Sequence, residues 1–299
     1  MSAITADAVP SLTHPEGPKL ISQRQRAIRT FLQNRPAVVG LVLILLITAI
    51  AIFAPWVAPH DPYDQSVRNR LAAPSWEYPL GTDDKGRDIL SRVIFGTRIA
   101  LQVGVFSVVL GGVLGTAIGV TAGYFGGKIE SALMRVTDIL LAFPDLITGL
   151  LVLAVLGPGL EKMILAIGLT IAPRFARIAY GPTLAIKEKE YIDAAKALGA
   201  KRGRVLRLHI LPNISGDLLV FASLWTASAI RLEASLSFVG LGVQPPTPTW
   251  GQMIKEGTLY LADRPLYALG PGLALLITVL AFNLIGDGFR DVLDPKARV

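Results

Sequence analysis

The stretch IALQVGVFSVVLGGVLGTAIGVTAGYFGG, which covers Ile99–Gly127, decides the class of fold. It carries no charged side chain, and about 20 apolar residues in a helix suffice to cross the roughly 30 Å hydrocarbon core of a bilayer. Within it, glycine recurs at every fourth position, at Gly111, Gly115, Gly119 and Gly123. Such a row of small residues lets a second helix approach closely. The stretch therefore predicts a membrane-spanning helix that packs against another helix, and not only against lipid.

The composition of the whole chain also indicates an integral membrane protein. Of its 299 residues, 52% are hydrophobic and 17% are charged, whereas soluble proteins average about 25% charged residues. The net charge of +7 fits the excess of Lys and Arg in cytoplasmic loops, so we assign it to topology and contact with membrane lipid, and predict no nucleic-acid partner. The absence of cysteine excludes disulfides, and three scattered histidines predict no metal site.

The apolar segments together predict an all-α, polytopic membrane protein with six transmembrane helices. The spans lie at about 37–58, 99–123, 136–157, 163–180, 218–241 and 266–287. Charged side chains interrupt the third, fourth and fifth of them, and such charges persist where they face other helices or water. Because Asp138, Arg174 and Arg177 lie near the ends of their spans, we place these three at the membrane interfaces.

The distribution of Lys and Arg predicts the orientation of the spans. Segment 1–35 carries five basic residues against two acidic ones, and segment 181–217 carries seven against four. Since basic loops stay in the cytoplasm, both are predicted to be cytoplasmic, together with the C-terminal tail 290–299. The membrane domain is then 36–289, with both termini inside. On the outer side, Ile89–Arg98 predicts a short interfacial helix before the second span.

The most polar interruption of the chain is YIDAAKALGAKRGRVLRLHILPN, Tyr191–Asn213. Leu184–Leu198 favours a helix by its content of Ala, Leu, Lys and Glu. Gly199 suits the left-handed conformation that ends helices, Lys201–His209 predicts a second short helix, and Pro212 is predicted to end it before the next span. By composition, the segment also fits an ordinary basic loop in contact with lipid head groups.

The order of residues in this segment resembles the loop signature of ATP-binding-cassette (ABC) importer permeases, which runs Glu-Ala-Ala, glycine, isoleucine, Leu-Pro at fixed spacing. The match is carried by Asp193, Ala194, Ala195, Gly199, Leu211 and Pro212. Two positions depart from the signature. Asp193 replaces the glutamate, and His209 stands where isoleucine is expected, with Ile210 one position later.

Further segments resemble the dipeptide and oligopeptide permeases within that group. They are Leu80–Arg92 before the second span, Leu236–Gly242 with Gln244–Gly251 in the fifth span and the outer loop that follows it, and Asn283–Pro295 at the end. The resemblance runs from about Val38 to Pro295 and is closest to the second of the two paired permease subunits. It implies a bundle like that of a type I ABC importer permease, in the bacterial inner (plasma) membrane.

The resemblance also implies partners. These are a homologous second permease, which makes a heterodimer, two cytoplasmic ATP-binding subunits, and an extracytoplasmic substrate-binding protein. The Asp193–Pro212 loop would couple the permease to the ATPases. Gly126-Gly-Lys128 lacks the glycine spacing and the following Ser or Thr of a phosphate-binding loop. We therefore expect a transport subunit and not an enzyme, with no cofactor of its own; ATP and Mg would be bound by the partner ATPases.

The substrate pathway has three candidate residues, Arg231, Glu233 and Asp145, all within predicted spans. Because Arg231 and Glu233 are two positions apart on a helix, they do not share a face, and at most one of them is expected to point inward; an interfacial pair is an equal alternative. The expected substrates are di- or oligopeptides, with nickel complexes or other small solutes as the alternative. Asp145 beside Pro144 would instead suit an ion-coupled secondary transporter. A non-transporting scaffold stays open as well.

Overall fold

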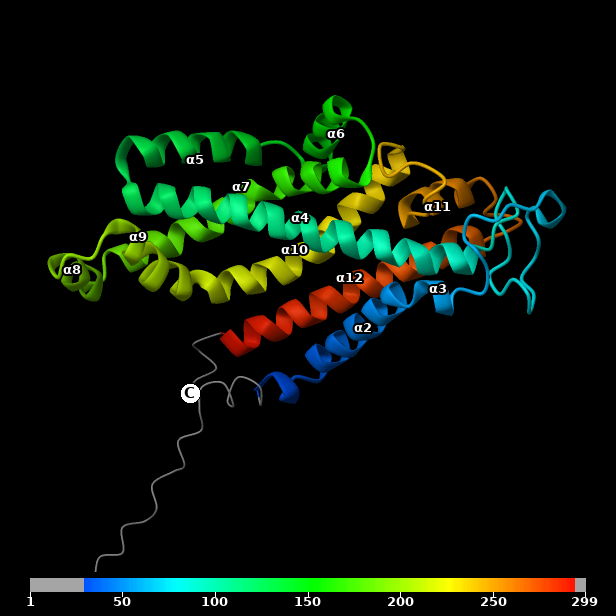
Figure 1. Cartoon of the computed structure of the whole chain (residues 1–299), viewed down its shortest axis with the longest axis horizontal. Coiled ribbons are helices and arrows are strands. Elements are labelled where there is room, and N and C mark those ends of the chain that lie inside the picture. The colour runs from blue at the N-terminus through cyan, green and yellow to red at the C-terminus, as the bar shows by residue number, and fades with distance from the viewer. Residues whose placement is uncertain (1–29, 294–299) are drawn as a thin grey trace, which may run out of the picture.

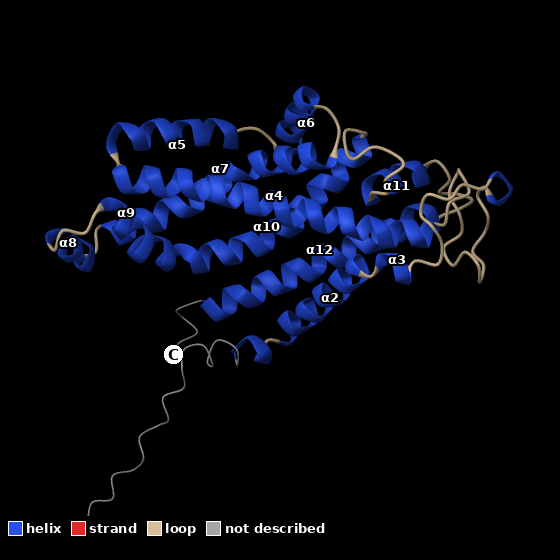
Figure 2. Ribbon diagram, in the orientation of Figure 1, coloured by secondary structure: helices blue, strands red, loops and turns tan. Residues whose placement is uncertain are grey.

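The computed structural model describes residues 30–293, and within that range it is built from helices and loops without a strand (Figure 2). The predicted all-α class is confirmed. The long helices run side by side (Figure 1). They are α2 (Arg35–Ile52), α4 (Ile89–Phe125), α7 (Leu160–Lys187), α10 (Leu211–Val239) and α12 (Leu266–Leu293). Short helices lie between them, namely α3 (Ala54–Val57), η1 (Val67–Asn69), α5 (Gly127–Leu141), α6 (Asp145–Leu156), α8 (Glu190–Ala197), α9 (Arg202–Val205), η2 (Leu206–Ile210) and α11 (Trp250–Thr258).

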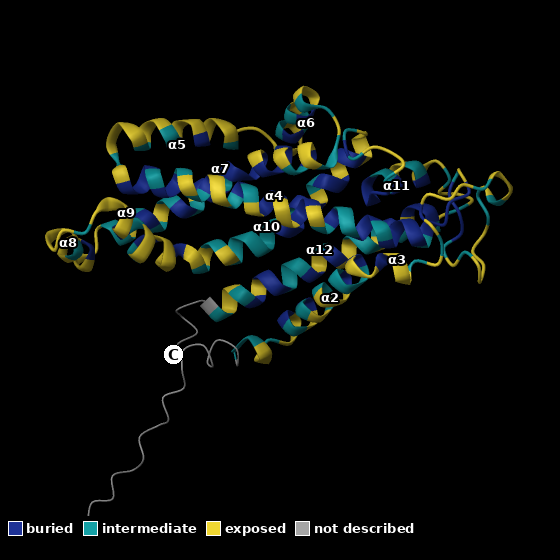
Figure 3. Ribbon diagram, viewed as in Figure 1, coloured by how far each residue is buried: buried dark blue, intermediate teal, exposed yellow. Residues whose placement is uncertain are grey.

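Five helical segments of the described chain are long and apolar enough to cross a membrane, and a sixth crossing results if α5 and α6 count as one broken span. Apolar side chains such as Val42, Val113 and Leu276 are more than half exposed on α2, α4 and α12 (Figure 3). Soluble monomers rarely expose large contiguous apolar surfaces. These faces therefore fit a bilayer.

The third predicted span, 136–157, is wrong as a single straight helix. The structure divides it between α5 and α6, which meet at an angle of 98°. The break falls at Phe143-Pro144, since a residue before proline is driven out of the helical region and Pro144 takes an extended conformation ahead of α6. Hydropathy reports where a chain is apolar, but it does not report the direction in which it runs.

The glycine row of α4 packs on α7, as its spacing predicts. A Cβ at Gly111 would lie 2.5 Å from Cγ1 of Ile171, and a Cβ at Gly115 or Gly119 would overlap the α7 backbone at Ala172 and Ala176. The contact between α4 and α7 is the most extensive helix pair in the described chain.

The start of α4 differs from the sequence prediction. The expected separate helix Ile89–Arg98 is the first part of α4 and continues into the span without a break. The Asp88 carboxylate caps this long helix by accepting hydrogen bonds from the amides of Leu90 (3.3 Å) and Ser91 (3.0 Å). An N-cap so far ahead of the apolar run explains why the helix begins early.

The polar segment 181–217 also differs from its prediction. Helix α7 continues to Lys187, and α9, η2 and α10 follow one another from Arg202 onward. Pro212 does not end a helix: it lies in the first turn of α10. The five-residue π-helix η2 precedes it, and a π-turn is a known way for a helix to continue past a local disturbance.

The described ends of the chain lie together at the end of the bundle that also carries α8 (Figure 1). The Asn34 side chain donates a hydrogen bond to Asp291 at 2.6 Å, and the rings of Phe31 and Phe289 lie 5.6 Å apart. Sharing one end agrees with the predicted topology, while the cytoplasmic side of that end stays a prediction. Most of the predicted tails 1–35 and 290–299 lies outside the described residues.

Candidate functional site: the α8 hairpin and a cavity beside α10

Helix α8 and its return form a hairpin that projects from one end of the bundle (Figure 1). Gly199 closes it with a φ of +84°, which side chains with a Cβ rarely adopt. The Gly199 amide donates to the Lys196 carbonyl at 2.9 Å, and the Ala200 amide donates to the Ala195 carbonyl at 3.0 Å. These bonds satisfy carbonyls that the end of a helix leaves free. The predicted glycine turn is thus present.

A single buried side chain anchors the hairpin. Ile192 is fully buried and packs in one cluster with Tyr124 of α4, Ala179 of α7, Val205 of α9 and Ile210 of η2. The cluster joins α8 to four other segments. Because α7 ends at Lys187 and α8 begins at Glu190, a force on the hairpin would pass directly into a spanning helix.

The outer face of the hairpin is small and polar. Asp193, Ala194 and Ala197 are exposed, and the Leu198 side chain beside them is 90% exposed. Asp193 accepts a hydrogen bond from Lys196 at 3.0 Å, and this contact raises the pKa of Lys196. Alanines with one projecting leucine make a surface that another protein can approach closely.

The residues of the loop signature divide between two places. Asp193, Ala194, Ala195 and Gly199 belong to the hairpin, whereas Leu211 and Pro212 are exposed in the first turn of α10. His209 is partly buried, and its ring lies 6.1 Å from the ring of Tyr191. Ile210 is fully buried. Ile210, one position later than the isoleucine of the signature, therefore packs in the core, and His209 faces the hairpin.

A cavity of about 600 Å³ lies among α6, α10 and α11. Two of the three predicted pathway residues, Asp145 and Arg231, line it together with Trp225 and Ser228. Glu233 does not: it is 1% exposed and accepts a hydrogen bond from Ser237 at 2.7 Å. Arg231 and Glu233 thus face different surroundings, as their spacing predicts.

The charged side chains at this cavity differ in whether they form an ion pair. Asp145 accepts an ion-paired hydrogen bond from Arg174 of α7 at 2.7 Å, and the Arg174 guanidinium lies 4.8 Å from the centre of the Trp225 ring. Arg231 is exposed and donates only to the neutral Ser228 hydroxyl at 3.1 Å among the described residues. The cavity therefore offers a cation without a carboxylate partner in residues 30–293.

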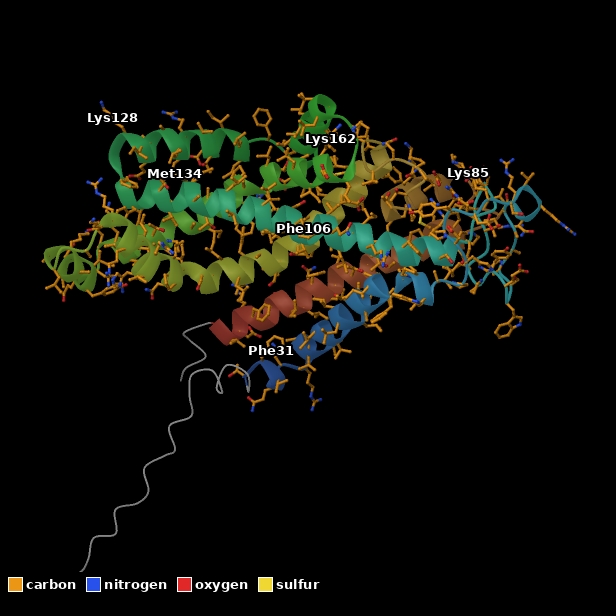
Figure 4. The ribbon with its side chains drawn as sticks, viewed as in Figure 1. Phe31, Lys85, Phe106, Lys128, Met134 and Lys162 are labelled. Carbon is orange, nitrogen blue, oxygen red and sulfur yellow. The ribbon has the colours of Figure 1, made fainter. Side chains whose placement is uncertain are left out.

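A ladder of polar pairs holds the broken span against α7. Its rungs are Glu130 with Tyr180, Asp138 with Arg177, and Asp145 with Arg174. Two rungs come from α5 and one from α6, so the ladder crosses the 98° bend. Figure 4 labels Lys128 at the exposed start of α5 and Met134, which is buried. Pairing explains how charges inside predicted spans are tolerated.

An ionic cluster at the opposite end was not predicted as a site. The carboxylate of Asp83, fully buried, accepts from Arg87 Nε at 2.6 Å and lies 3.4 Å from Arg92 Nε. Arg87 reaches Glu256 of α11 at 3.8 Å, and Tyr267 of α12 donates to Glu256 at 2.9 Å. The cluster joins the loop between α3 and α4, which carries the labelled Lys85 (Figure 4), to α4, α11 and α12. Sequence spacing within Leu80–Arg92 carried the resemblance, but it did not reveal this pairing.

The fold resembles that of a membrane-spanning chain in a solved ABC transporter. A chain of the MetNI methionine ABC transporter, solved in inward-facing conformations, superposes with a TM-score of 0.58 at 20% identity, covering 69% of this chain and 98% of that one. A second crystal form of MetNI gives a TM-score of 0.56 at 21% identity, covering 68% and 96%. At these identities the likeness concerns the fold, which is that of a type I ABC importer permease.

Residues 115–299 match the model of the family described as binding-protein-dependent transport system inner membrane component. Residues 22–74 match the N-terminal TM domain of oligopeptide transport permease C. The dipeptide transport system permease protein DppC of Alkalihalophilus pseudofirmus is 41% identical, with 93% of this chain and 91% of the relative covered. The glutathione transport system permease protein GsiD of Pectobacterium atrosepticum is 42% identical (90% and 90%), and that of Escherichia coli O6:K15:H31 is 41% identical (90% and 89%).

The chain therefore belongs to the family of binding-protein-dependent transport system inner membrane components. It is a multi-pass protein of the inner membrane and a permease component of an ABC importer. The predicted family and class of function are confirmed.

Proposed function

We propose that this chain is the permease subunit of an ATP-driven importer that carries di- or oligopeptides into the bacterial cell. The names of the relatives, which transport dipeptides and glutathione, support a peptide substrate. The cavity with Arg231, which has no carboxylate partner among residues 30–293, supports it independently, because each unmodified peptide carries a terminal carboxylate, and an arginine binds carboxylates through paired hydrogen bonds.

In this proposal the α8 hairpin docks into a cytoplasmic ATPase subunit. Two such subunits bind ATP and Mg, and their closure on ATP pushes the hairpin. The push travels through Ile192 and the end of α7 into the bundle. A homologous second permease completes the pathway, and a substrate-binding protein delivers peptide to the end that carries the outer loop. Transport then proceeds by alternating access of largely rigid halves.

The exposed alanine face of α8 is the observation on which the coupling role depends, and it can be tested by adding bulk. Ala194→Arg, in the full importer, is expected to reduce ATPase recruitment at least tenfold, because an arginine side chain at this exposed position would hold the two surfaces apart. Ala185→Arg is the matched control, since Ala185 is also exposed, near the end of α7 but outside the hairpin. Co-purification of the subunits measures the effect. Normal ATPase recovery and normal peptide-stimulated hydrolysis with Ala194→Arg would contradict the coupling role.

The substrate role of Arg231 can be tested with two peptides that differ in one group. Arg231→Gln is expected to weaken uptake of a dipeptide with a free carboxyl terminus by roughly tenfold, since a hydrogen bond to a charged group contributes about 1.5–3 kcal/mol. Uptake of the C-terminally amidated peptide by the same variant serves as the control and is expected to change little. An equal loss for both peptides would remove the carboxylate contact from the proposal.

A further inference from the structure

A second large cavity, of about 770 Å³, lies between α4 and the segment that runs from α9 through η2 into α10. Its lining on α4 extends from Val108 to Thr121, which is about 20 Å of helix at 1.5 Å per residue. One leaflet of hydrocarbon is about 15 Å thick, half of the roughly 30 Å core. The groove therefore runs along the depth of one leaflet, from the α8 end of the bundle toward its middle.

The walls and rim of this groove differ in chemistry. Along its length it is lined by aliphatic side chains such as Val109, Val113, Leu218 and Leu219. At the end near α8 it is lined by the exposed Arg207. Three more exposed cations lie close in sequence, Lys201, Arg202 and Arg204, and among residues 30–293 none of the four forms an ion pair with a carboxylate. An apolar groove with basic side chains at one end is complementary to an anionic phospholipid, which has apolar acyl chains and a negatively charged phosphate.

Two glycines in the groove have no explanation within the chain. A Cβ at Gly112 would meet the Phe175 ring at 3.5 Å, an ordinary contact, and a Cβ at Gly203 would meet nothing within 4 Å. Neither has a positive φ, and glycine inside a helix is less stable than alanine. On the same helix as Gly112, Gly115 and Gly119 are required by contact with α7. A side chain at Gly203 would therefore enter open space, and one at Gly112 would lie beside the Phe175 ring, which also lines the groove.

We propose that this groove binds an anionic phospholipid of the inner leaflet, with one acyl chain between α4 and α10 and the phosphate at Arg207. The site adjoins η2, the π-helix that links the hairpin segment to α10. A lipid bound there would stabilise η2, and with it the connection between the α8 hairpin and α10. This inference rests on membrane insertion and on the groove, and does not depend on which solute is carried.

The test uses the full importer in phosphatidylcholine nanodiscs that contain a small fraction of phosphatidylglycerol with a photoactivatable acyl chain. After illumination, mass spectrometry is expected to locate adducts on groove residues such as Val113 and Leu219. Arg207→Gln is expected to reduce these adducts at least fivefold. Arg204→Gln is the matched control, because Arg204 is equally exposed but does not line the groove, and it should leave the labelling unchanged.

A second comparison separates a specific site from general lipid contact. A photoactivatable phosphatidylcholine should label the groove several-fold less than the anionic probe, while both label the outward face of α2 alike. Equal labelling by both probes would overturn the proposal. So would a groove that is protected from every lipid because another subunit of the importer occupies it, which would be seen as protein cross-links at Val113.

Discussion

Gly199 carries the geometry of the coupling hairpin at the scale of a single residue. Its φ of +84° costs a residue with a Cβ about 1–2 kcal/mol. Gly199→Ala is therefore expected to loosen the hairpin and lower ATP-driven uptake several-fold while the bundle stays folded. Gly181→Ala, in α7, adds a Cβ to open space without a positive φ and is the control. Uptake in reconstituted vesicles and limited proteolysis of the hairpin would show the difference; equal effects of the two variants would contradict this role.

Single residues also show how much of the structure could be predicted from the sequence. Gly199 was predicted to turn the chain because its conformational freedom is a local property. Pro212 was predicted to end a helix for the same kind of local reason, yet it lies in the first turn of α10 behind a π-helix. Arg231 and Glu233 were placed on different faces by spacing alone, but only packing reveals that Arg231 lines the cavity and Glu233 is buried.

At the scale of elements, the α4–α7 contact depends on small side chains. Gly119→Val would drive side-chain atoms into the α7 backbone at Ala176, and overpacking of this kind typically costs about 1–3 kcal/mol. We expect a clear fall in the thermal midpoint of the purified subunit. Gly112→Ala should have little effect, since its Cβ would make an ordinary contact with Phe175. A midpoint unchanged by Gly119→Val would mean that the two helices are less closely packed.

The ion pair between Asp145 of α6 and Arg174 of α7 gives a second prediction at the scale of elements. The side chains of Asp145 and Arg174 are 32% and 33% exposed, so their coupling is expected to be about 1 kcal/mol or less, as for partly solvated pairs. A double-mutant cycle with Asp145→Asn and Arg174→Gln measures it through the free energy of unfolding. Purely additive effects would show that the rung does not hold the broken span in place.

Elements also mark where sequence reasoning fell short. The glycine row predicted a close contact with another helix because a helical period places its members on one face; the structure identifies that helix as α7. The third span was predicted as one straight helix because hydropathy sums over a window and carries no direction. Pro144 supplied the signal for the break, and the ladder from Glu130 to Asp145 shows what holds the two pieces. The buried Asp83 cluster joins residues far apart in the chain, which spacing does not reveal.

At the scale of the whole molecule, the two ends of the bundle have different constructions. One end is held together by the buried cluster of Asp83, Arg87, Arg92, Glu256 and Tyr267. The other end presents the α8 hairpin, which packs on the bundle mainly through Ile192. A cross-linked end and an end with a projecting hairpin fit the proposed transporter, in which substrate arrives at the first end and the ATPases act at the second.

The most direct test of this account is peptide uptake by the full importer, reconstituted in vesicles with its second permease, ATPases and binding protein. Uptake is expected to require ATP in the compartment that holds the ATPases, to be unaffected by collapse of ion gradients, and to fall at least tenfold with Ala194→Arg. Uptake that continues without ATP and follows an ion gradient would contradict the account and favour an ion-coupled transporter.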